Sequence, residues 1–282
     1  MKITPHKILR FVRRLPQTNH PLRTTLALLL QATGLSRAFV IQRPTYRLRF
    51  FPDSALSRSM WINPRQTRHE ETFVRKYLQA GDTMIDIGAN VGTVVFSAAT
   101  QVKNTGLVVA VEPHPRIFSY LTGNNDLNHF TNIEFVHAAV GQEEGIVQFS
   151  DKGSDDRNQV LDSGNISVPL TTLDALVEKL GISHIDLLKI DVEGYEKNVL
   201  LGAAQALQIT QCVFIETLES NLQQFGTSAA ELYDILWQHG FQMFYIFNSQ
   251  DDTLALRDPV LIEQRLGDLM LTPIPPANEQ TE

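Results

Sequence analysis

The stretch that decides the fold is Asp86-Ile-Gly-Ala-Asn-Val-Gly92, followed by Val108-Val-Ala-Val-Glu112-Pro113. The first part ends an apolar run with two glycines four residues apart, and an apolar, helix-like segment begins at Thr93. The second part is another apolar run, and it ends in a carboxylate 24 residues after Gly88. A strand, a glycine turn, a helix, a strand and an acid in this order are typical of a mononucleotide half-site.

The glycine spacing indicates which nucleotide is expected. A dinucleotide fingerprint has three glycines, whereas this turn has only Gly88 and Gly92, with Asn90 between them. The wider turn, preceded by an acid, is typical of S-adenosylmethionine (SAM) sites. Asp86 would then face the ammonium group of the ligand, and Glu112 would accept hydrogen bonds from a ribose. The alternative is that both glycines only permit a tight turn between strand and helix.

Apolar runs and amphipathic segments alternate along the chain, which predicts an α/β fold with a parallel sheet covered on both faces. Expected strands lie near residues 83–87, 107–112, 133–139, 186–191, 211–216 and 241–247, and expected helices near 92–101, 115–128, 172–181, 195–207 and 227–239. Two strands, 146–149 and 166–170, flank a polar loop at 150–165 that we expect to be a mobile cover or substrate loop.

The region before the glycine turn is harder to assign. It suggests a helix over 22–42, with Leu22, Leu26, Leu29 and Leu30 on one face, strands over 46–51 and 59–62, and a helix over 68–78.

Charge is distributed unevenly. Residues 1–52 contain ten Lys or Arg and no Asp or Glu, although the whole chain carries a net charge of −7. Residues 2–15 form a basic amphipathic pattern, which could lie on an anionic membrane surface, although packing on the domain is slightly favoured. We expect no nucleic-acid partner, because the rest of the chain is acidic.

Composition also suggests a location. The chain is 43% hydrophobic but has no continuous apolar stretch of about 20 residues that would span a bilayer. The single cysteine, Cys212, lies in an apolar run and is expected to be buried. A lone cysteine cannot form an internal disulfide, which fits a reducing cytosol. We therefore expect a cytoplasmic protein, with contact to the inner membrane surface through residues 2–15 left open.

Acids follow several of the expected strands, where ligands bind in open α/β sheets. Asp191 and Glu193 alternate along an extended backbone and would point the same way, and Glu216 ends the next strand. Either of the first two could accept a hydroxyl proton, both could bind a divalent metal, or they could cap the following helix. We expect Lys189 to pair with a neighbouring acid. His137 could be a base, but a core role is more usual. No spacing of His and Cys predicts a zinc site.

These motifs together resemble the FkbM family of SAM-dependent methyltransferases. The resemblance covers about residues 70–245 and rests on 86–92, 111–115, 139–141, 172–174, 185–194, 199–203 and 215–216, of which Leu-Lys-Ile-Asp-Val-Glu-Gly is the most specific. It implies a Rossmann-like class I methyltransferase fold, with a mostly parallel seven-stranded sheet, helices on both faces and a reversed final strand. It also implies methyl transfer from SAM, usually to a hydroxyl of a sugar, glycan or natural product.

The resemblance assigns roles by position. It implies that Asp86, Gly88, Asn90 and Gly92 line the methionine end of SAM, that Glu112 binds the ribose and that Ala138 borders the adenine. Asp191 and Glu193 match the acidic pair beside the transferred methyl. Thr93-Val94 departs from the aromatic pair that often follows the second glycine.

The chain then divides into a basic N-terminal helical extension with short strands (1–65), the methyltransferase domain (66–250) and a C-terminal segment with a disordered tail after Pro273 (251–282). The expected mechanism is in-line methyl transfer to a hydroxyl, with Asp191 as the first choice of base. Two alternatives stay open: a non-catalytic SAM-binding sensor or scaffold on a membrane, and an NAD-dependent dehydrogenase, which the glycine spacing disfavours.

Overall fold

The computed structural model describes residues 20–151, 155, 160, 164–247, 252–258, 265–266 and 272–273. The expected amphipathic helix at residues 2–15, most of the polar loop at 150–165 and the tail after Pro273 therefore lie outside the described residues. No helix within the described ranges has the length and apolar character needed to cross a bilayer.

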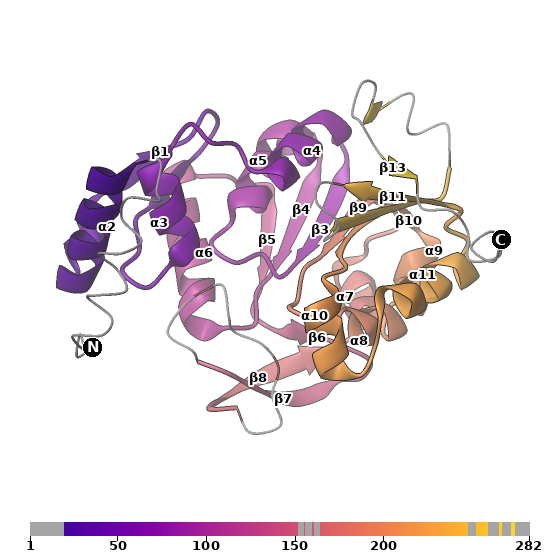
Figure 1. Ribbon diagram of the computed structural model, residues 1–282. Coiled ribbons are helices and arrows are strands. Elements are labelled where there is room, and N and C mark those ends of the chain that lie inside the picture. Colours follow the sequence, from indigo (N-terminus) through magenta and orange to yellow (C-terminus); the bar gives the residue numbers. More distant parts are fainter. Residues whose placement is uncertain are drawn as a thin grey trace.

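An eight-stranded sheet forms the centre of the structure, as Figure 1 shows. Its strand order is β13-β11-β12-β10-β9-β3-β4-β5. In chain order the strands are β3 (Thr83–Ile87), β4 (Leu107–Val111), β5 (Ile133–Val136), β9 (Ile185–Ile190), β10 (Thr210–Glu216), β11 (Met243–Phe247), β12 (Asp252–Leu256) and β13 (Thr272–Pro273).

The pairing of these strands confirms the mostly parallel α/β sheet. β5, β4, β3, β9 and β10 pair in parallel, while β12 runs antiparallel to both β10 and β11. The reversed strand implied by the family resemblance is therefore present. The count differs from seven only because the two-residue strand β13 adds to the edge at β11.

Helices cover both faces because neighbouring strand residues point to opposite sides. Met84 and Leu187 lie in one buried cluster, with residues of the helices α4 and α5, while Ile85 and Leu188 lie in the other, with residues of α7, α8, α9 and α11. The helices that follow the N-terminal segment are α4 (His69–Tyr77), α5 (Thr93–Val102), α6 (Pro115–Asn128), α7 (Leu173–Leu180), α8 (Glu196–Leu201), α9 (Ala204–Gln208), α10 (Glu219–Leu222) and α11 (Ala229–Gln238).

The N-terminal segment shares the core of the sheet domain. Its elements are α2 (Pro21–Thr33), the short 3-10 helix η2 (Leu35–Ala38), β1 (Val40–Gln42), β2 (Arg47–Arg49) and α3 (Ala55–Ile62). Arg43 forms a fully buried ion pair with Glu71 of α4 at 2.8 Å, and the Tyr46 hydroxyl donates to the same carboxylate. Leu48 and Phe50 join the apolar cluster that contains Phe73. Residues 20–62 therefore pack as part of one body with the sheet.

Four expected elements differ from the structure. The strand expected near 133–139 forms two strands, Ile133–Val136 in the main sheet and Ala139–Val140 in a smaller sheet. The helix expected over 22–42 ends at Thr33, because Gly34 adopts a left-handed conformation, and the end of that range becomes β1. The expected strand at 59–62 belongs to helix α3, whose N-cap Ser54 accepts a hydrogen bond from the Ser57 backbone. The expected helix 195–207 is divided into α8 and α9 at Gly202, which packs against Gly141.

β12 was not among the strands expected from the apolar pattern, although the family resemblance implied a reversed strand. It lies in the range expected as the C-terminal segment, 251–282, yet it pairs on both sides within the sheet. A separate three-stranded sheet, in the order β6-β8-β7, lies beside the main one; its strands are β6 (Ala139–Val140), β7 (Gly145–Phe149) and β8 (Ile166–Thr171).

Candidate active site

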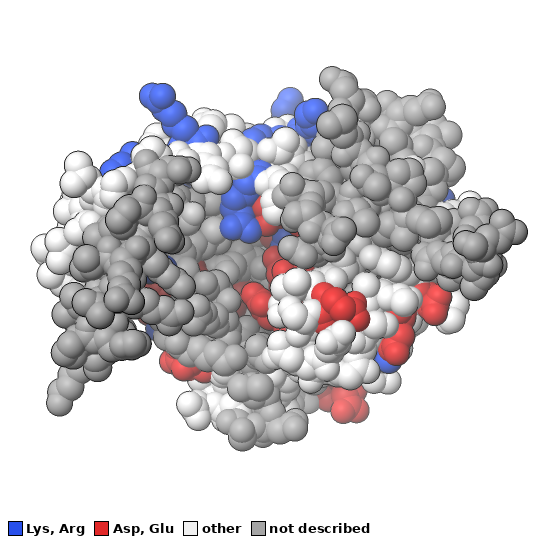
Figure 2. Space-filling view, in the orientation of Figure 1, with Lys and Arg blue, Asp and Glu red and all other residues white. Residues whose placement is uncertain are grey.

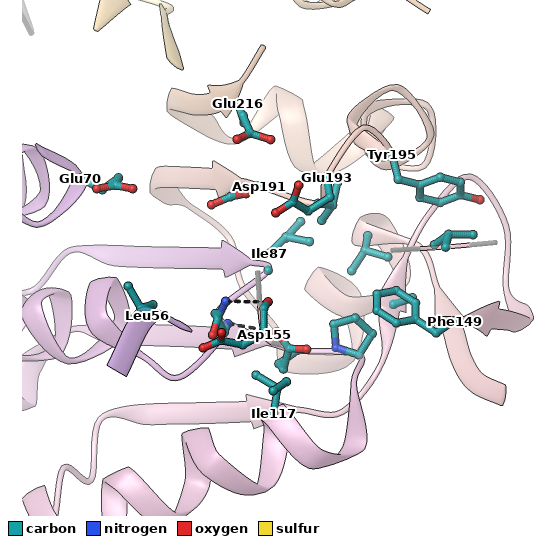
Figure 3. Close-up of a pocket in the computed structure, with 18 of the residues that line it drawn as sticks. Leu56, Glu70, Ile87, Ile117, Phe149, Asp155, Asp191, Glu193, Tyr195 and Glu216 are labelled. Carbon is teal, nitrogen blue, oxygen red and sulfur yellow. Dashed lines mark hydrogen bonds between the residues drawn. The ribbon is translucent and has the colours of Figure 1, made fainter. Parts of the chain in front are cut away.

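A cavity of about 520 Å³ lies at the carboxyl edge of the parallel strands. Figure 3 shows carboxylates of Asp191, Glu193 and Glu216 on one side of it, with Ile117 and Phe149 on others. Sequence-derived candidates that line it are Gly88, Asn90, Glu112, Ala138, Asp191 and Glu193. Asp86 and Gly92, which were expected to line the methionine end, do not line the cavity. Asp86 is buried against Lys189, and Gly92 packs against Phe96 and Leu121. On the outer surface, Figure 2 shows acidic side chains near the centre of the visible face.

The glycine turn is shaped by contacts between neighbouring strands. Gly88 has a φ of +89°, and a Cβ atom there would lie 1.9 Å from the Asp191 carbonyl oxygen. Gly92 has a φ of +95°, and its Cβ would overlap the Phe96 ring and Leu121 at 2.5 and 2.7 Å. Gly88 therefore lets two strand ends meet at the cavity, while Gly92 allows α5 to pack against α6.

Asn90 connects the turn to two other parts of the cavity wall. Its φ is +51°, and its side-chain oxygen accepts from the Val91 backbone N–H at 2.7 Å. Its amide Nδ2 donates to the Asp155 carbonyl oxygen at 3.2 Å. The Asp155 carboxylate in turn accepts from the Ala55 backbone N–H at 2.7 Å and from the Ser54 hydroxyl. Asp155 thus joins the glycine turn to the N-terminal end of α3.

Glu112 is held in place by the backbone around it. One carboxylate oxygen accepts from the Asn90 N–H at 3.0 Å and the other from the His114 N–H at 2.9 Å. Burial raises the pKa of Glu112 to about 7, although both N–H groups lower it. Each oxygen retains a second lone pair. The carboxylate can therefore still accept hydrogen bonds from two adjacent hydroxyls.

A buried ion cluster lies below the cavity floor. Lys189 Nζ is 3.2 Å from Asp86 Oδ1 and 3.2 Å from Asp191 Oδ2, so the expected pairing of Lys189 is confirmed. Asp86 is only 1% exposed. Burial raises its pKa, and Lys189 opposes that rise. Burial alone would lower the pKa of Lys189, but the carboxylates of Asp191 and Asp86 raise it.

Asp191 and Glu193 reach the same cavity by a route that differs from the expected extended backbone. Glu193 has a φ of +57°, so the chain turns after β9 instead of continuing as a strand. Glu193 accepts a hydrogen bond from Asn221 Nδ2 at 3.0 Å. Gly194 is also left-handed, and its Cβ would lie 2.5 Å from the Asn221 carbonyl. The turn brings both carboxylates toward the cavity and fixes one of them.

Neither acid caps the following helix. The N-cap residue of α8 is Tyr195 and makes no side-chain capping bond. The turn is bridged instead by Glu196, which accepts from the backbone N–H groups of Val192 and Gly194 at 3.0 and 3.2 Å. Burial raises the pKa of Glu196 to about 7. The helix-capping alternative for Asp191 and Glu193 is therefore wrong.

Glu216 completes the row of acids at the ends of the strands. Its Oε2 atom is buried and has no hydrogen-bond partner among the described residues. Burial raises its pKa to about 9, with added repulsion from Asp191 and Glu193. Burial and the neighbouring carboxylates therefore favour the protonated, uncharged form of Glu216.

Sequence reasoning missed the residues at the start of α4. Arg68, His69 and Glu70 line the cavity, and Arg68 binds both carboxylate oxygens of Glu70, at 2.5 and 3.2 Å. These residues could have been found from the sequence, because α4 leads directly into β3. Such a helix runs back along the sheet, so its first turn lies at the carboxyl edge of the strand.

Asp252 was missed for a different reason. Because β12 runs antiparallel to β10, its first residue, Asp252, pairs with the last residue of β10, Glu216. His69 Nε2 lies 2.5 Å from Asp252 Oδ2. Burial would lower the pKa of His69, but Asp252 and Glu70 raise it. Only knowledge of the reversed strand could have placed Asp252 here.

The remaining candidates lie elsewhere. His137 is exposed and stacks on Phe118 at 4.7 Å, so the core interpretation of His137 is wrong, and it does not line the cavity. Cys212 is buried as expected. Among the described residues no group of three or more His, Cys, Asp or Glu side chains is arranged to hold a metal ion.

A Rossmann-like sheet with a glycine turn, a strand-end acid and a strand-end cavity defines a nucleotide-binding α/β protein. The family model described as "Methyltransferase FkbM domain" matches residues 86–243, more than half of the chain. The protein therefore belongs to the FkbM methyltransferase family.

Two curated relatives are similar over shorter stretches. The hexuronic acid methyltransferase AglP of Haloferax volcanii is 30% identical over 157 residues, which is 54% of this chain and 64% of that protein. The AMB antimetabolite synthetase AmbE of Pseudomonas aeruginosa is 37% identical over 75 residues, 26% of this chain and 4% of that protein. The chain thus spans less than two thirds of either relative.

Solved structures are also similar. The FkbM methyltransferase of Methylobacillus flagellatus KT has a TM-score of 0.46 and 14% identity, covering 88% of this chain and 60% of that one. Fibrillarin of Aeropyrum pernix, solved with natively bound SAM, has a TM-score of 0.40 and 13% identity, covering 64% of this chain and 67% of that one.

Proposed function

We propose that this protein uses SAM to methylate an oxygen atom, most simply a hydroxyl of a sugar, glycan or natural product. The observation that carries the proposal is the Glu112 carboxylate at the cavity, held by two backbone N–H groups and able to accept from a ribose. The family assignment favours this catalytic interpretation over a non-catalytic sensor or scaffold. The family assignment also disfavours the alternative of an NAD-dependent dehydrogenase.

The cavity suits SAM in size and chemistry. Its volume of about 520 Å³ lies within the range of small-molecule sites. Glu112 would bind the ribose, and the apolar wall at Ile117, Ala138 and Phe149 would contact the adenine. Gly88 and Asn90 would border the methionine end. Asp86 would not contact SAM directly, because its partner is the ammonium group of Lys189. Through Lys189 it would help to hold Asp191 at the cavity.

The chemistry requires little beyond positioning and one proton acceptor. When bound, SAM supplies a methyl group on a sulfonium that is already activated for displacement. Asp191 would accept the acceptor's hydroxyl proton. Lys189 holds Asp191 Oδ2, while Oδ1 makes no hydrogen bond with a described residue and can face the acceptor. Glu193, fixed by Asn221, would position the same hydroxyl.

The charge around the cavity bears on the kind of oxygen that is methylated. A hexuronic acid, named in the relative AglP, offers both hydroxyls and a carboxylate. Asp191, Glu193 and Glu216 line this part of the wall. Because the carboxylates of Asp191 and Glu193 would repel a second carboxylate, we propose a hydroxyl, giving a methyl ether.

The first experiment is calorimetric titration with SAM of the wild type, Glu112→Ala and the control Glu134→Ala, whose side chain is exposed on β5. We expect micromolar binding that only Glu112→Ala loses. Titration with NADH tests the dehydrogenase alternative. Binding of NADH and not SAM would overturn the proposal.

Methyl transfer is then followed with radiolabelled SAM and a panel of neutral and uronic-acid oligosaccharides. The product is treated with mild alkali, which cleaves methyl esters and leaves methyl ethers intact. Label that survives alkali supports hydroxyl methylation. Label released by alkali would show that a carboxylate is the acceptor.

A further inference from the structure

Helix α2 presents an apolar stripe to the outside. Leu22, Leu26 and Leu29 lie on one face at helical spacing, yet they are 86%, 48% and 59% exposed. The buried face carries Ala27 and Gln31 instead. Spacing that usually marks a core-facing helix surface therefore points away from the core.

The orientation of α2 is fixed by polar contacts. The amide Nε2 of Gln31 donates to the carbonyl oxygens of Phe51 and Ser54 at 2.8 and 2.9 Å, and its Oε1 accepts from Arg58 at 2.9 Å. Arg23 donates to the Trp61 carbonyl at 2.6 Å. These bonds tie the helix to α3 and the loop before it, so the leucines stay outside.

The apolar surface continues beyond α2. Leu35, Phe39 and Val40 are also exposed, so six of the nine large apolar side chains that are exposed among the described residues come from positions 22–40. Such concentration on one short segment marks an interaction surface. In Figure 2, uncharged atoms follow the edge of the molecule where Figure 1 places α2. We call these six residues the leucine face.

Basic residues lie close to the leucine face along the chain. Arg37 lies between Leu35 and Phe39, and it lines a second cavity of about 500 Å³ together with Arg49 and Arg116. Arg116 is paired with Asp53 and with Asp151. The guanidinium groups of Arg37 and Arg49 form no hydrogen bond or ion pair with a described residue.

The charge of the whole chain is also positive at the N-terminal segment and negative elsewhere. Residues 1–52 hold ten Lys or Arg and no acid, while the rest of the chain holds all 31 acids and the other 14 bases. An anionic surface would therefore attract the N-terminal segment and repel the remainder. This complementarity selects an anionic bilayer as the occupant of the leucine face.

We propose that the leucine face docks on the surface of an anionic lipid bilayer. Its apolar side chains enter the interface between headgroups and acyl chains, and Arg37 and Arg49 contact lipid phosphates. Because α2 is bonded to the start of α3, whose Ala55, Leu56 and Ser59 line the large cavity, the docked protein holds that cavity close to the membrane.

Flotation of the full-length protein with lipid vesicles tests the proposal. The vesicles contain phosphatidylcholine alone or with about 30% phosphatidylglycerol, at low and high salt. We expect binding only to the anionic vesicles, weakened by salt. The triple variant L22S/L26S/L29S should bind at least about tenfold less. The control I146S/L201S changes exposed apolar residues elsewhere and should bind as the wild type does.

The pair R37Q/R49Q should reduce both binding and its salt dependence. Thermal unfolding followed by circular dichroism shows that each variant is folded. The proposal is overturned if the wild type does not float, or if L22S/L26S/L29S floats equally well, which would leave residues 2–15 as the contact. It is also overturned if light scattering finds a wild-type dimer that the triple variant loses while vesicle binding is unchanged.

Discussion

The backbone of Gly88 lies directly against the carbonyl oxygen of Asp191, so closely that a Cβ atom would be 1.9 Å from that oxygen. The glycine turn after β3 and the acid after β9 therefore form one structural unit, although they are more than 100 residues apart. Asp191 N–H also donates to the Ile87 carbonyl at 3.0 Å. The position of the proposed base depends on the turn beside it.

Gly88→Ala should strongly destabilise the protein. The new methyl group would meet backbone, which cannot move aside as a side chain can, and the left-handed φ adds strain. We expect a loss of at least about 3 kcal/mol in the free energy of unfolding, measured by urea titration.

The matched control is Gly123→Ala within α6, where a Cβ has no neighbour within 4 Å. This change should be neutral or stabilising by up to about 1 kcal/mol. Similar unfolding curves for the two variants would mean that Gly88 does not contact Asp191 as described.

Lys189→Met should destabilise the protein by about 3–5 kcal/mol, because it leaves the Asp86 carboxylate buried without its cation. Burial already raises the pKa of Asp86, and loss of Lys189 raises it further. The carboxyl then binds a proton in the folded state, so the loss of stability should become smaller as pH falls.

Urea unfolding of Lys189→Met between about pH 5 and about pH 8 measures this change. The double variant D86N/K189M, which removes the buried charge, should recover part of the stability, and its difference from the wild type should no longer depend on pH. Equal instability of the single and double variants at all pH values would argue against an Asp86–Lys189 pair.

The folded protein should lose stability as pH rises above the ordinary carboxyl range. Burial raises the pKa values of Glu112 and Glu196 to about 7 and that of Glu216 to about 9, from 4.5. In this window the folded state binds more protons than the unfolded state, so stability falls with rising pH. Unfolding at about pH 5.5 and about pH 8.5 measures the difference. In Glu216→Gln, stability should fall less at the upper end of this pH range than in the wild type. An equal fall in both proteins would count against the raised pKa of Glu216.

SAM binding should show the opposite dependence on pH. A ribose donates hydrogen bonds, so it favours the ionised form of Glu112, whose pKa is about 7 in the free protein. We expect affinity to increase about tenfold between about pH 6 and about pH 8 by calorimetry. Glu112→Gln should bind more weakly and with little pH dependence. A wild-type affinity that is constant over this range would exclude Glu112 titration from the binding step.

Asp191→Asn should lower methyl transfer by about 100-fold or more while SAM affinity changes little. The amide keeps the shape of the side chain but cannot accept a proton. Asp126→Asn, an exposed acid on α6, is the control and should retain full turnover. Full turnover by Asp191→Asn with unchanged SAM binding would remove Asp191 from the mechanism.

The sequence was sufficient for the local features of the fold. The positions of the buried strands follow from continuous apolar runs such as Leu107–Val111, because both faces of the sheet are covered. The start of α6 was placed at Pro115, which favours the first turn of a helix. The glycine turn and Glu112 could be recognised because their spacing along the chain is itself the motif.

Only the tertiary structure decided which side chains meet. Asp252 reaches Glu216 through a reversed strand, Asp155 bonds to Ser54 across about 100 residues, and Asp86 turns toward Lys189 instead of lining the cavity. The leucines of α2 face outward because Gln31 finds buried carbonyl partners. Periodicity specifies that a helix has an apolar side, but long-range hydrogen bonds and strand order determine where that side points.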